Sequence, residues 1–238
     1  MKKIAIHITL FSCILFALSV NQLFAQYAYF GLKGGINISY FRGSDADPET
    51  FWGTGSEQNP RVGFIGGVYV TIVITRIIAL QPELLISMMG TKYNWASDGE
   101  YDHLTLKLTY AQIPLLLKIY IPAGQHVKPH LSVGGYFALN GSAKFSREYN
   151  LPSYGLGQGT MEGDIEGIIP MGGSYIQYVS KPEYGILVGL GSDFIIRGYQ
   201  FTFDARYSLG LREIFELESD VVPDIKNGAF SIMIGFGF

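Results

Sequence analysis

The sequence has almost no cysteine: among 238 residues the single one is Cys13, inside an apolar stretch near the N-terminus. The chain after this residue therefore offers no disulfide, no cysteine-ligated metal site and no thiol nucleophile. Charged residues are also scarce, at 16%, and the formal net charge is −3. This balance provides no basic surface for nucleic acid, so we expect no nucleic-acid partner.

Residues 1–25 have the three parts of a secretory signal peptide. Two lysines open the chain, the apolar run Ile4–Val20 follows, and Ala25 supplies a small residue at the cleavage position. An uncleaved membrane anchor and a lipoprotein modified at Cys13 are the alternatives. Polar interruptions in the run, and its continuation past Cys13, favour cleavage. We therefore predict one mature domain, residues 26–238.

Beyond the predicted signal peptide, the sequence lacks any long hydrophobic run. A helix that crosses a bilayer needs at least about 18 consecutive apolar residues, and no such stretch is present. Glycine, with 30 residues, and aromatic residues, at 14%, are instead abundant. This composition, with so few charges, is unusual for a soluble domain. A membrane location must therefore depend on β-strands.

Eight segments alternate between apolar and polar side chains with the period of a β-strand. The clearest is 199–211, where every odd position is apolar or aromatic and every even position is polar or glycine. The others lie at about 29–39, 62–74, 78–91, 104–121, 127–139, 184–194 and 229–238. In 104–121, which contains Pro114, the alternation slips midway, and we therefore predict a bulge or an edge-like kink there.

The connections between these segments alternate in length. Short ones are expected at 75–76, 122–125 and 197–198, and long polar ones at 42–61, 94–103, 143–182 and 212–227. Short periplasmic turns opposite long outer loops are typical of an outer-membrane barrel. We therefore predict an all-β fold, an eight-stranded antiparallel transmembrane up-and-down β-barrel in the cell outer membrane. The sheet must close because unpaired backbone groups are costly in hydrocarbon.

Several charged side chains fall on the inward face of the predicted barrel. They are Lys33, Glu83, Lys118, Lys128, His130, Asp193, Asp204 and Arg206. Neighbouring strands would carry Glu83 with Lys118, and Asp193 with Asp204 and Arg206. An eight-stranded barrel is just wide enough for its own side chains, and enclosed charges are costly without partners. We interpret the set as a mixed-sign plug across the lumen, which argues against a general porin.

Three motifs carry a family resemblance: Gly-Leu-Lys-Gly-Gly-Ile-Asn at 31–37, Leu-Gln-Pro-Glu-Leu-Leu at 80–85 and Tyr-Ala-Gln-Ile-Pro-Leu-Leu-Leu-Lys at 110–118. With them the chain resembles the outer-membrane β-barrel family common in Bacteroidetes that includes the PorT-like proteins. The resemblance covers essentially the whole mature chain. It implies insertion by the barrel-assembly machinery, which a terminal aromatic such as Phe238 suits. The PorT-like branch is linked to a secretion system that exports surface proteins, but no residue assigns this chain to that branch.

Residues suited to catalysis or metal binding are few. His103 lies beside Asp98, Glu100 and Asp102 in the expected connection 94–103, but no spacing ties a serine to His103. The acidic residues also lack the spacing of a calcium loop. An enzyme at the outer rim and a weak cation site are alternatives. We interpret the stretch as a hydrated loop and expect no catalytic residue, no metal and no cofactor.

The sequence therefore favours a non-enzymatic outer-membrane barrel that acts through its extracellular loops as a scaffold or interaction protein. The resemblance adds a link to protein secretion or the cell surface. The predicted protein-partner surface is the connection 143–182, whose apolar side chains include Leu151, Tyr154, Leu156, Ile165, Ile168 and Ile169. We expect a monomer surrounded by outer-membrane lipids. Two alternatives stay open: a narrow-lumen transporter of a small solute, and a soluble lipocalin-like barrel with an apolar ligand inside.

Overall fold

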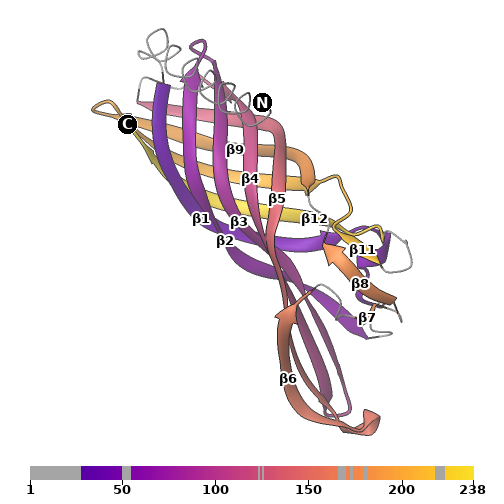
Figure 1. Cartoon of the computed structure of the whole chain (residues 1–238). Helices are drawn as coiled ribbons and strands as arrows, with labels where there is room; N and C mark the ends of the chain where they lie inside the picture. The colour runs from indigo at the N-terminus through magenta and orange to yellow at the C-terminus, as the bar shows by residue number, and fades with distance from the viewer. Residues whose placement is uncertain are drawn as a thin grey trace, which may run out of the picture.

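The computed structural model describes residues 28–49, 55–122, 124, 126–165, 170–171, 174–179, 182–217 and 223–238. The predicted signal peptide lies outside these residues and stays a prediction. Long antiparallel strands wrap into a barrel, and several of them continue beyond it as a narrow sheet (Figure 1). No helix in the described residues is long and apolar enough to cross a membrane.

Eight strands form the barrel. They are β1 (Ala28–Arg42), β2 (Ser56–Val73), β3 (Ile78–Ser97), β4 (Glu100–Tyr120), β5 (Val127–Leu151), β9 (Glu183–Ile196), β10 (Tyr199–Gly210) and β12 (Lys226–Gly237). Hydrogen-bonded neighbours run in the order β4-β3-β2-β1-β12-β10-β9-β5, and β4 also pairs with β5, which closes the ring. All these pairings are antiparallel. The predicted eight-stranded antiparallel barrel is therefore confirmed.

One end of the barrel carries the short connections between strands. The first strand, β1, begins at this end and the last strand, β12, finishes there. The turn between β9 and β10 consists of Arg197 and Gly198, both with positive φ, and 74–77 join β2 to β3. The chain end lies here as well, because Phe238 exchanges backbone hydrogen bonds with Phe30. We call this the short-turn end and the opposite one the long-loop end. The predicted turn at 122–125 lies partly outside the described residues.

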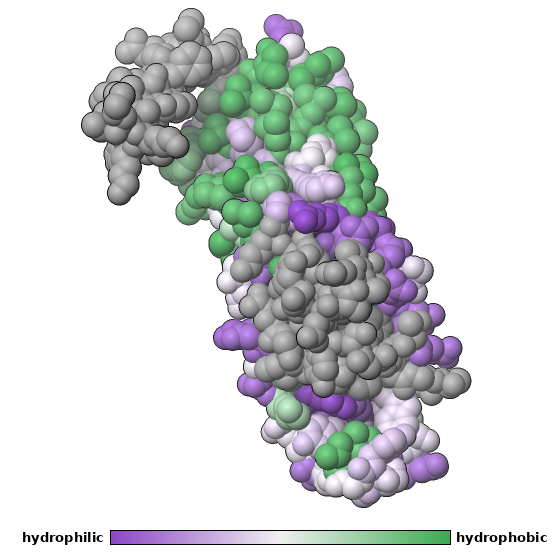
Figure 2. All heavy atoms as spheres, turned by 45° about the vertical axis from the view of Figure 1, so that its right-hand side comes forward, coloured by the Kyte–Doolittle hydropathy of each residue, from purple (hydrophilic) through white to green (hydrophobic). Residues whose placement is uncertain are grey.

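Apolar side chains point away from the barrel over the half nearest the short-turn end. This surface, which we call the apolar belt, includes Leu32, Phe64, Ile86, Ile113, Leu115, Leu131, Phe137, Leu139, Val188, Phe203 and Ile234, all of them exposed. On the face seen in Figure 2, hydrophobic residues gather over the barrel and hydrophilic ones lie beyond it. A lipocalin-like carrier would need its apolar face inside, so the structure rules out that alternative.

Strand β4 keeps a single phase along its whole length, so the predicted slip within it is wrong. Even-numbered side chains are buried inward from Asp102 to Tyr120. What changes is their chemistry: the inward side is charged at Lys118 but apolar at Leu106, where the outward neighbour is Lys107. The inversion marks the point where the strand leaves the apolar belt, because beyond it the inside must be apolar and the outside polar, as in a soluble sheet.

A bulge does exist, but it lies on the partner strand. The pairs Tyr110–Asn140 and Thr109–Ser142 leave Gly141 of β5 without an opposite residue. Beyond this extra residue the inward positions of β5 become odd-numbered, which turns Phe145 to the inside. The bulge therefore brings β5 into phase with the apolar interior of the outer sheet.

The connection expected at 94–103 is not a loop. Strands β3 and β4 stay paired out to Ser97 and Glu100, and Asp98 and Gly99 join them with φ values of 50° and 81°. Two consecutive residues with positive φ form the tight turn that suits the twist of a hairpin. The expectation of a long polar loop is therefore wrong, because Asp98-Gly99 is a hairpin signal and joins two paired strands here.

Much of the connection expected at 143–182 is also strand. β5 runs on to Leu151, passes through the short helix η2 (Pro152–Tyr154) and returns as β6 (Leu156–Asp164), which pairs with β5. With the outer ends of β2, β3 and β4, these strands form an extended sheet, residues 56–60, 91–107 and 143–164, which we call the blade. It projects from the long-loop end (Figure 1).

Short elements surround the mouth of the barrel beside the blade. Strands β7 (Pro170–Met171), β8 (Ser174–Val179) and β11 (Phe215–Leu217) make a small separate sheet, and η1 (Ser44–Ala46) follows β1. One apolar cluster fills the interior of this end and includes Phe41, Met89, Leu106, Leu108, Phe145, Val179, Ile214, Phe215 and Ile225. The outer part of the molecule therefore has a hydrophobic core of its own.

Candidate functional site

The lumen of the barrel holds a buried cluster of charged side chains. Lys33 of β1 donates to Glu83 Oε1 of β3 at 2.8 Å and to Asp204 Oδ2 of β10 at 2.9 Å. Arg206 donates to both oxygens of Glu83, at 2.7 and 2.9 Å, and to Asp204 at 2.9 Å. Two cations and two carboxylates thus form one ring of contacts, with every side chain at most 3% exposed.

A second group lies against the first. Lys118 of β4 donates to both oxygens of Asp193 of β9 at 2.9 Å. The same carboxylate accepts from Tyr120 Oη and Gln200 Nε2, each at 2.7 Å. Asp193 is therefore satisfied by one charged and two neutral donors, which is what a buried carboxylate requires.

His130 connects the two groups. Its Nε2 lies 3.1 Å from Asp204 Oδ1, and its Nδ1 lies 3.7 Å from Asp193 Oδ1. Space for this arrangement comes from Gly191, where a Cβ atom would stand 2.8 Å from both Asp204 Oδ1 and His130 Nε2. A side chain at that position would push the imidazole and the carboxylate apart.

Seven of the eight charged residues singled out from the sequence meet in this cluster, but their partners differ from expectation. Glu83 binds Lys33 and Arg206 instead of Lys118, and Asp193 binds Lys118 instead of Arg206. The expected pairs lay on neighbouring strands, whereas the long side chains reach across the lumen. The eighth residue, Lys128, is partly exposed and lies 6.0 Å from the ring of Tyr120, toward the short-turn end.

The three cations Lys33, Lys118 and Arg206 face the three carboxylates Glu83, Asp193 and Asp204, so the cluster is formally neutral when His130 is neutral. Toward the long-loop end the next layer is apolar and contains Ile65, Leu85 and Met233. A cavity of about 10 Å³ lies between this layer and Arg206, which is room for about one water molecule. Side chains therefore fill the lumen at both levels.

Glu183 is a buried carboxylate that sequence reasoning missed. It lies at the long-loop end of β9, is 2% exposed, and accepts from Tyr136 Oη at 2.7 Å and Asn227 Nδ2 at 2.6 Å. The segment read from the sequence began one residue later, at Tyr184. The inward phase of Gly185 and Asp193 on the same strand was the signal that could have placed Glu183 inside.

The acidic stretch around His103 does not form a site. Asp102 points inward and accepts two hydrogen bonds from Arg147, at 2.8 and 2.5 Å, whereas His103 points outward and stacks on Tyr101. Glu100 accepts from the hydroxyl and backbone of Ser153 instead. Within the described residues no three His, Cys, Asp or Glu side chains lie close enough together to hold a metal ion.

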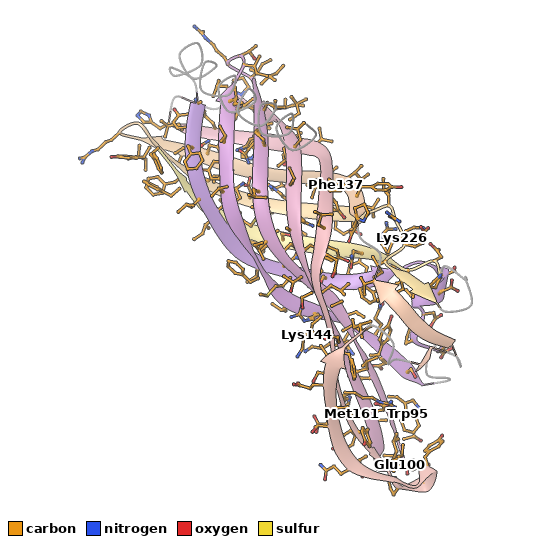
Figure 3. All side chains as sticks on the ribbon, in the orientation of Figure 1. Trp95, Glu100, Phe137, Lys144, Met161 and Lys226 are labelled. Carbon is orange, nitrogen blue, oxygen red and sulfur yellow. The ribbon has the colours of Figure 1, made fainter. Side chains whose placement is uncertain are left out.

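The blade is an exposed surface outside the belt. Glu100 lies at its tip, and Trp95 and Met161 lie along it on neighbouring hairpins (Figure 3). Of the apolar residues expected in a loop at 143–182, Leu151 and Ile165 are buried, whereas Tyr154 and Leu156 are 71% and 49% exposed. Ile168 and Ile169 lie outside the described residues.

A closed eight-stranded barrel with an apolar outer belt and a charged lumen is what a bilayer-spanning sheet requires. Residues 22–216 match the family described as outer membrane protein beta-barrel domain. The chain belongs to this family. This outer-membrane barrel protein is therefore placed in the cell outer membrane, with its belt in the hydrocarbon.

The chain is similar to solved structures of outer-membrane proteins at low identity. The attachment invasion locus protein Ail of Yersinia pestis is 11% identical, with 89% of this chain and 99% of Ail covered and a TM-score of 0.41. OprG of Pseudomonas aeruginosa is 15% identical, with 89% and 95% covered and a TM-score of 0.45. The outer membrane protease OmpT of Escherichia coli is 10% identical, with 89% and 95% covered and a TM-score of 0.33. No curated protein matches the sequence.

Proposed function

We propose that this protein is a non-enzymatic outer-membrane scaffold that binds a protein partner at the cell surface through its blade. The observation that carries the proposal is the length of the strands. At a rise of about 3.4 Å per residue, the 21 residues of β4 span roughly 70 Å, whereas the apolar band of a membrane barrel is about 25 Å tall. Much of each long strand therefore lies beyond the membrane, on the outer side of the cell.

The lumen supports this proposal over transport. The Arg206–Glu83 pair joins strands on opposite sides of the barrel, the Lys33–Glu83 pair joins two strands that are not adjacent, and the apolar layer beyond them leaves a cavity of about 10 Å³. A permeating solute would have to separate buried ion pairs, which costs several kcal/mol. The resemblance to PorT-like proteins suggests the class of partner: a surface protein or a component of its export.

The side chains of the blade also support a binding role over catalysis. Trp95 is partly exposed and Met161 is 45% exposed, and aromatic residues and methionine are enriched in protein interfaces. His103, by contrast, is engaged by Asn94, whose Oδ1 lies 3.1 Å from its Nδ1, and the adjacent Asp102 points to the other face of β4 and pairs with Arg147. We therefore assign the partner surface to the hairpins β3–β4 and β5–β6.

The structure allows the blade to be shortened without touching the barrel. Tyr93 pairs directly with Leu104, and Arg147 with Met161, so an Asn-Gly turn can replace 94–103 and 148–160. With a photo-cross-linking amino acid at Glu162, which is exposed and retained, intact cells should yield one defined protein adduct. The trimmed variant should lose the adduct and still show the heat-modifiable gel migration of a folded barrel.

A control and an opposing outcome accompany this experiment. The same cross-linker at Leu115, in the belt, should give no protein adduct. An adduct from Glu162 that persists in the trimmed variant would exclude the deleted segments, 94–103 and 148–160, as the binding surface. Steady conductance of the intact protein in planar bilayers, altered by Asp204→Asn, would instead favour a channel.

A further inference from the structure

Three lysines form a row on the outward face of the molecule, one on each of three neighbouring strands. Lys107 of β4 stands directly opposite Lys144 of β5. Lys92 of β3 pairs with Thr105, two residues from Lys107 on the same face, and is therefore its diagonal neighbour. Like charges directly opposite each other destabilise an antiparallel pair. We call Lys92, Lys107 and Lys144 the lysine row.

The row lies at the edge of the apolar belt. Along β5, Phe137 and Leu139 are the last large apolar side chains of the belt, and Lys144 follows the bulge at Gly141. Figure 3 shows Lys144 where the barrel passes into the blade, with Phe137 on the barrel. In Figure 2 hydrophilic residues border the apolar belt directly. The three ammonium groups therefore lie at the level of the headgroups of the outer leaflet.

Their partners distinguish these lysines from another lysine at the same rim. Lys226, on β12, forms ion pairs with Asp224 and, at 3.3 Å, with Glu213. Among the described residues no carboxylate forms an ion pair with a lysine of the row. The nearest acid in the sheet register is Asp164, opposite Lys144 on β6. Glu162 and Glu57 are diagonal neighbours of Lys144 and Lys92 in the same register, but Glu162 accepts from Ser146 Oγ at 2.9 Å instead.

We propose that the lysine row binds the phosphate groups of the phosphorylated glycolipids in the outer leaflet of the outer membrane. The sign of the charge, the outward direction and the position beside the belt all fit an anionic lipid headgroup. Lysine suits this task because a compact charge on a flexible stem can follow a mobile phosphate. Phosphates between the strands would also offset the repulsion between Lys107 and Lys144. This lipid site lies at the base of the blade beside the belt, whereas the hairpin ends 94–103 and 148–160, which the partner would contact, lie farther out.

The test compares the wild type with the triple variant Lys92→Gln/Lys107→Gln/Lys144→Gln in two kinds of vesicle. One contains phosphatidylcholine alone, and the other adds bisphosphorylated lipid A. The readout is the temperature at which the heat-modifiable gel band of the folded barrel disappears. Lipid A should raise this temperature for the wild type, and the variant should lose most of the increase. In phosphatidylcholine alone the variant should be at least as stable as the wild type, because a repulsion has been removed.

Further arms separate the sources of phosphate and guard against a folding defect. Lys226→Gln removes a paired charge at the same rim and should keep the full response to lipid A. Dephosphorylated lipid A, or inorganic phosphate in solution, should not raise the temperature. Should the triple variant fail to fold, Lys107→Gln alone should still reduce the lipid A response. A triple variant with an undiminished response, or an equal effect of dephosphorylated lipid A, would overturn the proposal.

Discussion

Lys33 Nζ lies 2.8 Å from Glu83 Oε1, although the two residues belong to β1 and β3, which are separated by β2. Such a contact requires a lumen narrow enough for side chains of non-adjacent strands to meet. Arg206, on β10, reaches the same carboxylate from another side. Glu83 is therefore the residue that ties three non-adjacent strands together inside the barrel.

Replacing Glu83 with glutamine should destabilise the barrel strongly. The substitution leaves Lys33 and Arg206 buried with a single shared carboxylate, Asp204, and removing one partner of a buried ion pair costs about 3–5 kcal/mol. Urea-induced unfolding in lipid vesicles measures the loss of unfolding free energy. Glu57→Gln, the same change at an exposed position of the blade, is the matched control and should be nearly silent. Equal stability of the two variants would show that the cluster is not held by its charges.

Leu115→Arg and Thr105→Arg test where the membrane ends. Both residues point outward from β4, but Leu115 is 52% exposed within the belt, whereas Thr105 lies in the blade. An arginine facing lipid near the midplane costs about 2–4 kcal/mol, and much less in water. Unfolding in vesicles should therefore show a clear loss for Leu115→Arg and little change for Thr105→Arg. Similar losses at both positions would contradict the boundary inferred from the polarity inversion.

Leu106→Ala should weaken the blade while leaving the barrel intact. Leu106 is 2% exposed and belongs to the apolar cluster of the outer part, and truncation of a buried leucine typically costs about 2–5 kcal/mol. Hydrogen exchange of the amides of 93–104 should become faster, with the barrel amides unchanged. The control is Leu117→Ala on the outward face of the same strand, which should not change exchange in the blade.

The turn at the tip of β3 and β4 depends on a glycine at its second position. Gly99 has φ 81°, a conformation that costs a residue with a side chain roughly 1–2 kcal/mol. Gly99→Val should therefore increase proteolysis at the blade tip. Asp98→Asn, which keeps a residue suited to positive φ, should leave the cleavage rate unchanged. If both variants are cleaved at the wild-type rate, the tight turn is not formed in solution.

A pH-dependent contact joins the tips of two hairpins. Hydrogen bonds from the Ser153 hydroxyl and from its backbone N–H lower the pKa of Glu100 below its usual value. Because these bonds favour the ionised carboxylate, the contact is complete above the usual glutamate pKa and is lost as pH falls through the lowered one. An NMR titration of Glu100 should show this low pKa, and Ser153→Ala should raise it. An unchanged pKa in Ser153→Ala would exclude the contact.

The sequence predicts the barrel well because alternation is a local property. Along 199–211 the polarity of each side chain indicates whether it points into or out of the barrel, and this can be read without knowing the partner strand. The blade was harder to predict from the same rule, because β4 keeps its phase while the polarity of each face inverts at the edge of the bilayer. The inversion looks like a slip in the sequence alone, where the position of the membrane surface is unknown.

The charge cluster, too, could be predicted from the sequence only in part. Inward direction follows from alternation, so seven of the eight charged residues chosen from the sequence do meet. Their pairing does not follow, because the Lys33–Glu83 and Arg206–Glu83 contacts depend on the stagger of strands and on the reach of side chains across the lumen. The inward position of Glu183 was not predicted, because the apolar alternation of its strand starts one residue later, at Tyr184.

Strands β3, β4 and β5 pass from the bilayer into the blade. The pairing of β3 with β4 is continuous from Leu85 to Ser97. A flexible hinge would let an attached partner drift independently of the wall. In this protein a force applied at the tip of the blade is transmitted along the paired strands to the barrel in the membrane. The blade is thus a continuation of the barrel wall, and a partner bound as proposed would be held at a fixed height and orientation relative to the membrane.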